Sequence, residues 1–113
     1  MLQNRVTNQI AVHTVLDYFD GPQIVEARDL IGGHYLGVRI PEGPAGDFLV
    51  LGVEPDRLKA FRNGELSLLD LIQTRPYGWY FGSLADEETS LVVRELMDQD
   101  IPEDCLPGPN YFL

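Results

Sequence analysis

The chain has 113 residues, of which 44% are hydrophobic, and its formal net charge at neutral pH is −10. A chain of this length buries roughly two thirds of the surface that its unfolded form exposes, so we expect one domain over 1–113 that needs no disulfides. The charge disfavours direct binding to nucleic acids or anionic membranes, because an acidic surface repels phosphate groups.

Three features of the sequence indicate where the protein is located. The chain contains a single cysteine, Cys105, which cannot form an internal disulfide. The first ten residues lack the apolar core of a secretory signal. The longest apolar run, at 48–53, is far shorter than the ~20 residues of a membrane helix. We therefore expect a cytoplasmic protein without a membrane span.

The first third of the chain predicts three strands. Residues 9–19 are rich in β-branched and aromatic side chains, and the Asp-Gly-Pro sequence at 20–22 then supplies a turn. Residues 23–30 and 34–40 follow on either side of a glycine pair at 32–33. This pattern predicts a hairpin, because glycine tolerates the positive φ that tight turns require.

The glycine pair also predicts a register for this hairpin. A two-residue loop at 32–33 would place Ile31 opposite His34 and Glu26 opposite Arg39. One face of the hairpin would then be apolar and the other charged and aromatic, and a four-residue loop would leave both faces unchanged. The charged and aromatic face would carry Glu26, Arg28, Tyr35 and Arg39.

The middle of the chain predicts a covered strand followed by a helical hairpin. Residues 47–53 are apolar on both parities, so both faces of that strand should be covered. A first helix begins at Pro55, since proline suits the first helical position, and ends at the Asn-Gly pair at 63–64. Ser67 and Asp70 then have the spacing of a capping box for a second short helix.

The last third of the chain predicts two more strands and an extended tail. Residues 77–84 are dense in aromatic side chains, and residues 90–97 fit a strand or a helix, with a strand favoured. We expect an α+β fold, an antiparallel β-meander of about five or six strands with a short helical hairpin packed on or beside the sheet. Free edge strands in such a sheet would offer a route to a homodimer.

Acidic residues are concentrated in a Pro-containing C-terminal segment, 85–113. Between Ala85 and Asp104 there are eight acids and one base, Arg94, so this part carries −7 of the −10. A surface of this charge favours a protein partner with a basic surface. Seven of these acids form the predicted partner-binding surface, namely Asp86, Glu87, Glu88, Asp98, Asp100, Glu103 and Asp104.

Four strings in the sequence resemble a small bacterial domain family of unknown function. They are YFDGP at 18–22, IVEARD at 24–29, GHYLGV at 33–38 and EPDRLKAFRNGELSLLDLI at 54–72. Members of that family share a YYDGP turn, three strands and two short helices, and the resemblance extends over roughly 10–113. It implies a fold, a bacterial or phage-related origin and a soluble protein, but no site residues. Some members form the N-terminal part of longer proteins, and this chain would then be such a part.

Catalytic and metal-binding signatures are weak in this sequence. His13 and His34 lack the spacing of a metal-ligand pair, so we predict no metal and no cofactor. Cys105 follows an acid, which opposes the reactive thiolate form. Acid–base catalysis would require several carboxylates to converge at one end of the first hairpins. The candidates for such a group are Asp17, Asp20, Glu26 and Asp29.

These observations favour a non-enzymatic interaction module, either a regulatory, immunity or inhibitor-type subunit or an appended domain of a bacterial or phage system. A second hypothesis is a nucleic-acid mimic, whose carboxylates would occupy the groove of a DNA- or RNA-binding protein. A third is a small enzyme or a binder of anionic ligands, in which Arg28 and Arg39 would hold the anion.

Overall fold

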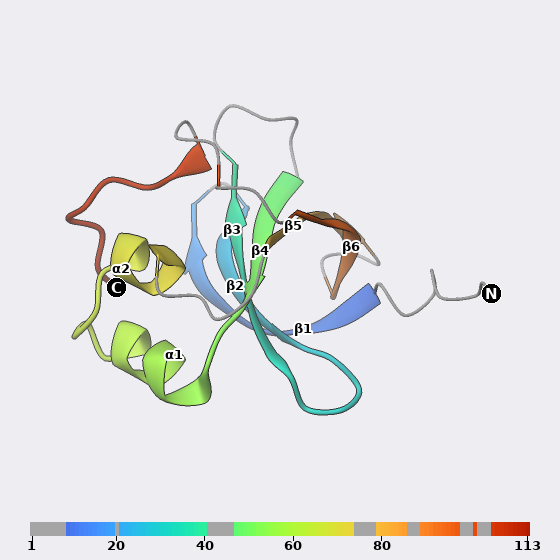
Figure 1. The fold of residues 1–113 in the computed structure, drawn as a ribbon, viewed down its shortest axis with the longest axis horizontal. Coiled ribbons are helices and arrows are strands. Elements are labelled where there is room, and N and C mark those ends of the chain that lie inside the picture. Colours follow the sequence, from blue (N-terminus) through green and yellow to red (C-terminus); the bar gives the residue numbers. More distant parts are fainter. Residues whose placement is uncertain are drawn as a thin grey trace.

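The computed structural model describes residues 9–19, 21–40, 47–73, 79–85, 89–97, 101 and 105–113. Within these ranges, six strands and two helices follow one another along the chain (Figure 1). They are β1 (Gln9–Tyr18), β2 (Pro22–Arg28), β3 (His34–Arg39), β4 (Asp47–Gly52), α1 (Pro55–Arg62), α2 (Leu68–Gln73), β5 (Trp79–Ala85) and β6 (Ser90–Met97). The predicted order of strands and helices is confirmed, and residues 90–97 form a strand.

The strands form an antiparallel meander that closes into a barrel. Each strand pairs with the next, and β1 also pairs with β6, with Ile10 opposite Leu91. Register shifts in β1 between Val12 and Thr14 and between Val15 and Asp17 mark bulges, which bend and twist a strand. The predicted meander is therefore correct, but the open sheet is wrong.

Closure of the barrel removes the basis for the predicted edge-strand homodimer. All six described strands have two neighbours in the sheet, so none of them presents a free edge along its paired length. A row of unpaired backbone groups is what recruits a second chain at an edge strand.

The strands are apolar on two sides. Side chains from strands all around the ring, among them Val25, Phe48 and Leu91, fill the barrel interior. A second cluster joins Leu49 and other outward-facing side chains to both helices. Strand β4 contributes to both clusters, which confirms the prediction that each of its faces is covered.

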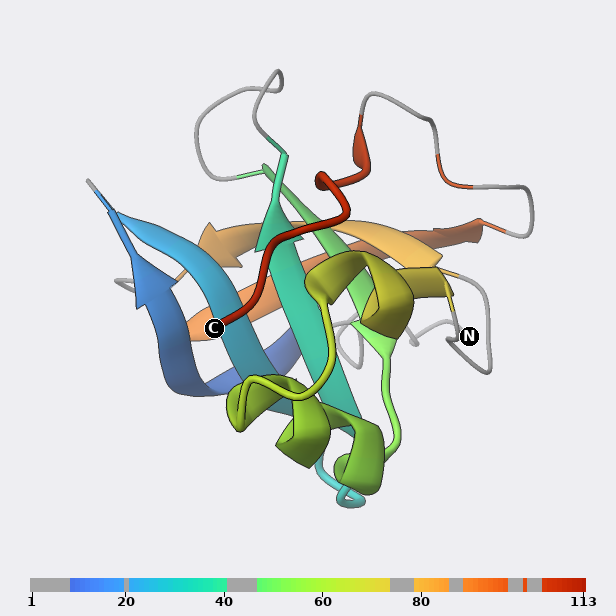
Figure 2. The same cartoon turned by 90° about the vertical axis from the view of Figure 1, so that its left-hand side faces the viewer.

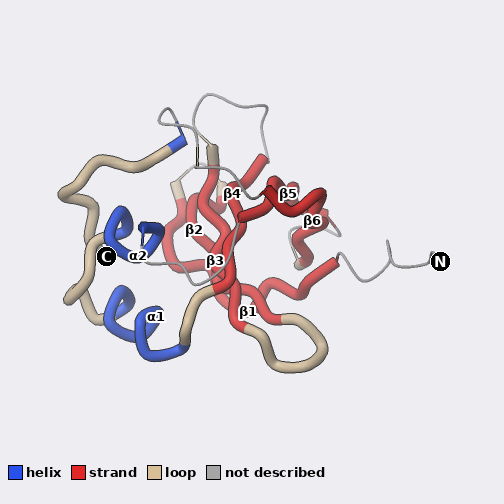
Figure 3. The backbone as a smooth tube through the Cα atoms, in the orientation of Figure 1, coloured by secondary structure: helices blue, strands red, loops and turns tan. Residues whose placement is uncertain are grey.

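The helices lie side by side against one outer face of the barrel (Figures 2 and 3). Helix α1 begins at Pro55 and ends at Arg62, with Asn63 as its C-cap, and Gly64 then adopts a φ of +78°. The Oγ atom of Ser67 accepts a hydrogen bond of 3.1 Å from the backbone N–H of Asp70, as the capping pattern predicts. Buried leucine and aromatic side chains such as Phe61 join the helices to the strands beneath them.

The hairpin of β2 and β3 has a different register from the one predicted. Glu26 lies opposite Leu36, and Ala27 lies opposite Tyr35, across a five-residue connection at 29–33. An odd number of loop residues reverses the parity of one strand relative to the other. Glu26 therefore shares its face with apolar β3 side chains, and the predicted pairing with Arg39 is wrong.

The C-terminal residues 105–113 form an extended segment that crosses the strands beside α2 (Figure 2). The backbone oxygen of Tyr111 accepts a hydrogen bond of 2.9 Å from the N–H of Leu68, the first residue of α2. The hydroxyl of Tyr111 donates a hydrogen bond to Asp17 of β1. The tail thus connects the helical layer to the barrel.

Candidate functional site

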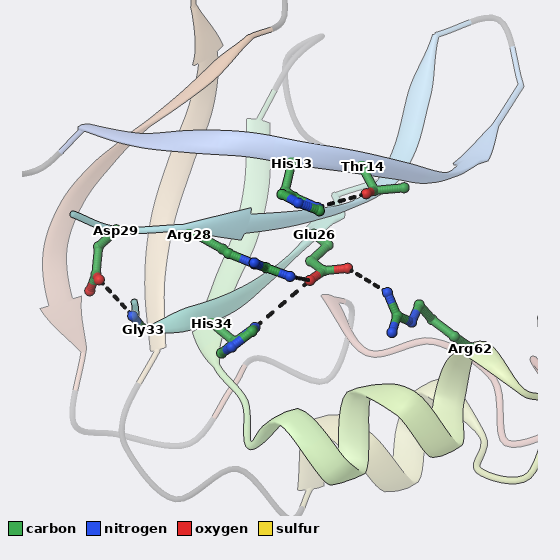
Figure 4. A network of polar contacts seen from close by, with 8 residues as sticks. All are labelled: His13, Thr14, Glu26, Arg28, Asp29, Gly33, His34 and Arg62. Carbon is green, nitrogen blue, oxygen red and sulfur yellow. Dashed lines mark hydrogen bonds and ion pairs between the residues drawn. The ribbon is translucent and has the colours of Figure 1, made fainter. Parts of the chain in front are cut away.

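A buried carboxylate lies where α1 covers the outer face of the barrel. Glu26 is only 1% exposed, although it is ionisable. Its Oε1 accepts a hydrogen bond of 3.0 Å from Nη1 of Arg62, and its Oε2 accepts one of 3.3 Å from Nη2 of Arg28. Nδ1 of His34 lies 3.8 Å from the same Oε2 (Figure 4). We call these four residues the Glu26 cluster.

The cluster fastens α1 to the barrel. Burial of a carboxylate costs several kcal/mol unless other groups pair with it, and here two guanidinium groups do so. Arg62 comes from the last turn of α1 and is 36 positions from Glu26 in the sequence. The side chains of Arg28 and Arg62 are 41% and 42% exposed, so both extend from the buried carboxylate into solvent.

Asp29 organises the loop between β2 and β3. Its Oδ1 accepts hydrogen bonds from the N–H groups of Ile31 (3.1 Å) and Gly33 (2.7 Å), and its Oδ2 accepts one from the hydroxyl of Tyr35 (2.9 Å). Gly32 supplies the positive φ, +89°, that this turn requires. The side chain of Asp29 therefore stabilises this conformation of the loop.

The same contacts change the acidity of both partners. Burial acts to raise the pKa of Asp29, but the hydrogen bonds from Gly33, Tyr35 and Ile31 outweigh it, and the pKa lies below its usual value. Burial, followed by the hydrogen bond to Asp29 and its charge, raises the pKa of Tyr35 to about 12.

Two aliphatic side chains stand in water at the end of this loop. Leu30 is 104% exposed and Ile31 is 93% exposed, the highest values among the large hydrophobic residues that the structure describes. We call this pair the apolar tip. The loop that carries it projects beyond the strands at the bottom of Figure 1. Because Asp29 fixes the backbone, the pair is held out from the barrel rather than folded back onto it.

A cavity of about 540 Å³ opens at the same end of the barrel. Its walls include Tyr35 and Tyr80 from the strands and the start of α1, with glycines at 32, 33 and 52. His34 belongs both to this cavity and to the Glu26 cluster. Ligand sites commonly have this size and occur at the mouths of β-barrels. The cluster, the apolar tip and the cavity together make this the candidate binding end.

A smaller cavity, of about 350 Å³, lies near the opposite end of β3. Asp17, Arg39, Cys105 and Tyr111 contribute to its walls. Burial, then the hydrogen bond to Asp17 and its charge, raises the pKa of Tyr111 to about 12. The C-terminal tail forms much of this cavity, which makes it a seam between the tail and the barrel.

The predicted ligand face is divided between the two ends of the molecule. Glu26 and Arg28 are together, as predicted. Tyr35 is on the other parity and faces Asp29, while Arg39 lines the cavity at the far end of β3. His34 and Arg62, instead of Tyr35 and Arg39, lie beside Glu26. The four acids proposed for acid–base catalysis do not converge, because Asp17 pairs with Tyr111 at the other end, and Asp20 lies outside the described residues.

The sequence contains little information that would identify His34 and Arg62, the two residues of the Glu26 cluster that were not predicted. His34 is recognisable only as a histidine beside a turn, and its approach to Glu26 follows from the five-residue loop. Arg62 reaches Glu26 through the packing of a helix on a sheet, which leaves no local pattern. The seven acids of the predicted partner-binding surface (86–88, 98, 100, 103 and 104) lie outside the described residues.

No family model matches the chain, and no curated protein or solved structure matches it. The resemblance to the YYDGP family therefore stays a prediction. Neither α1 nor α2, the helices that the structure describes, has the length and hydrophobicity to cross a membrane. Within the described ranges, no three His, Cys, Asp or Glu side chains are close enough together to hold a metal ion.

Proposed function

We propose that this protein is a non-enzymatic interaction module of the bacterial cytoplasm that binds a protein partner through the apolar tip. The observation that carries the proposal is the near-complete exposure of Leu30 and Ile31 on a loop that Asp29 fixes. Such a module would act as a regulatory, immunity or inhibitor-type subunit, or as an appended domain.

Burial of the apolar tip in a complex would contribute favourable free energy to binding. Full burial of a Leu or Ile side chain contributes about 1.5–3 kcal/mol, and in the free protein neither Leu30 nor Ile31 obtains it. Ordering a flexible loop on binding would oppose that gain. Here the hydrogen bonds of Asp29 have already ordered the backbone, so this part of the cost of binding is reduced.

The net charge of −10 supports a partner with a basic surface around an apolar pocket. The two aliphatic side chains would enter the pocket, while the acidic residues of 85–113 would speed association by attracting the basic rim. Among the described residues no free sheet edge competes with this surface for a partner.

The experiment is a tagged capture from the native host, followed by affinity measurements with the purified partner. Replacement of both tip residues by serine, L30S with I31S, should raise Kd at least a hundredfold, on the order of the loss expected when two side chains that are buried in the complex are removed. Folding should be unaffected, since both positions are exposed. The matched control is V92S, on β6, where the side chain is 37% exposed. Equal Kd values for the tip variant and the control would contradict the proposal.

The acidic segment has its own variant. Charge reversal of Asp86, Glu87 and Glu88 to lysine should slow association and flatten the dependence of Kd on salt. If binding is unchanged at every salt concentration, these acids have no part in the interface. Displacement of the partner by duplex DNA would instead indicate a nucleic-acid mimic that blocks a DNA- or RNA-binding protein.

A further inference from the structure

We propose that Arg28, His34 and Arg62 also bind the oxyanion of a small organic ligand whose body occupies the cavity at the barrel mouth. This site is independent of the apolar tip and goes beyond the proposed protein interaction. The three side chains approach Glu26 from different directions and surround it with donors (Figure 4).

The first argument is a local reversal of charge. The whole chain has 18 acidic residues and 8 Lys or Arg residues. In the Glu26 cluster two guanidinium groups and an imidazole meet a single carboxylate. Glu26 neutralises one of the two guanidinium charges, so the cluster keeps a positive charge in an acidic protein. An excess of cationic donors is what an oxyanion site requires.

The second argument is that several donors are unused. A guanidinium group has five N–H donors, and Glu26 accepts one from each arginine. Nε of Arg28 and Nδ1 of His34 are buried and have no hydrogen-bond partner among the described residues. Buried polar atoms of this kind are few in native proteins, and each one calls for an explanation. Because both atoms are closed to water, the donors open to a ligand are the remaining N–H groups of the two half-exposed arginines.

The third argument is that the cluster adjoins a cavity through one of its members, His34. His34 lines the cavity of about 540 Å³, which suits a small molecule. Tyr35 and Tyr80 offer aromatic surface for an apolar or aromatic body. The carboxylate of Asp29 is occupied by its own loop, whereas Glu54 lines the cavity and is exposed, so solvent screens the charge with which it opposes an anion.

The probes are phenyl phosphate, inorganic phosphate and benzoate, each at the same ionic strength. With wild-type protein, phenyl phosphate should raise the melting temperature by about 5 °C at tenfold its Kd. A response to benzoate of similar size would assign the site to carboxylates, and a weaker response to inorganic phosphate would show that the cavity contributes. A melting temperature that none of the probes changes would overturn the proposal.

Variants distinguish a site from general charge attraction. R28Q should weaken Kd for phenyl phosphate about tenfold, measured by calorimetry, because a hydrogen bond to a charged group is lost. R94Q is the control, since Arg94 is a half-exposed arginine of β6 that pairs with Asp47, away from the cluster. Equal weakening by R28Q and R94Q would overturn the proposal.

A second variant keeps the test informative if R28Q unfolds. E26Q preserves the shape of Glu26 but removes the internal anion that competes for the same donors. Its affinity for phenyl phosphate should rise severalfold, and the ligand should restore more of its melting temperature than it adds to wild type. If E26Q binds no better than wild type, the cations serve only to hold Glu26 and the proposal fails.

Discussion

Two carboxylates three positions apart have unrelated roles in this protein. Glu26 is buried under α1 and pairs with arginines from two elements. Asp29 stands in the next loop and accepts hydrogen bonds from Ile31, Gly33 and Tyr35. At the scale of single residues, burial and partners rather than residue type decide what each acid does.

The tyrosine–aspartate pairs predict loss of stability in alkali. The pKa values of Tyr35 and Tyr111 are raised to about 12 from 10, so the folded state holds these protons more tightly than the unfolded state. Their contribution is complete below about pH 10 and is lost as the pH rises towards about 12. Urea unfolding across this range should give a falling free energy of unfolding, with a shallower fall for Y111F. A fall of equal slope in Y111F would contradict the account.

At the scale of elements, much of the fold could be predicted, because the ends of its helices and strands are set by residues nearby in the sequence. Pro55, Asn63 and Ser67 mark helix ends through backbone chemistry that acts within a few residues. The register of β2 and β3 could not be predicted. Gly32 and Gly33 suggested a two-residue loop, whereas Asp29 leaves the strand to bind the loop amides and lengthens the loop to five residues. The length of the loop therefore depends on a side-chain hydrogen bond, which the pattern of apolar and polar residues in the sequence does not reveal.

The pairing of β4, β5 and β6 depends on a glycine. A Cβ atom at Gly82 would lie 2.9 Å from Cγ2 of Val50 and 3.2 Å from the backbone oxygen of Val92. We predict that G82A lowers the free energy of unfolding by about 1–3 kcal/mol through this overpacking. G108A is the control, because its Cβ would meet no atom within 4 Å. Urea unfolding measures both, and a G82A protein as stable as G108A would show that the strands tolerate the added methyl.

At the scale of the whole molecule, the barrel separates a binding end from the end at which the C-terminal tail is attached. The cavity, the Glu26 cluster and the apolar tip share one end, and the pair of Asp17 and Tyr111 holds the tail at the other. Closure of the barrel could not be predicted from alternation of side chains, because an open sheet with covered faces shows the same pattern. Half of the candidate site could be predicted. Glu26 and Arg28 are two positions apart on one strand, whereas Arg62 reaches Glu26 only through tertiary packing.

Closure has a measurable consequence on β6. Leu91 is fully buried in the barrel interior, whereas its neighbour Val92 points outward and is 37% exposed. We predict that L91A lowers the free energy of unfolding by about 2–5 kcal/mol and that V92A lowers it by about 1 kcal/mol or less. Similar values from denaturant unfolding for the two variants would mean that β6 does not seal a barrel.

The central claim is that the β2–β3 loop is the surface with which this protein binds its partner. Hydrogen exchange of the protein, alone and bound to the captured partner, tests it most directly. We predict that binding slows exchange at the backbone amides of Ile31 and Gly32 and at the mouth of the cavity around Val53. Protection confined to other surfaces, such as the acidic segment 85–113, with the tip unchanged, would contradict the claim.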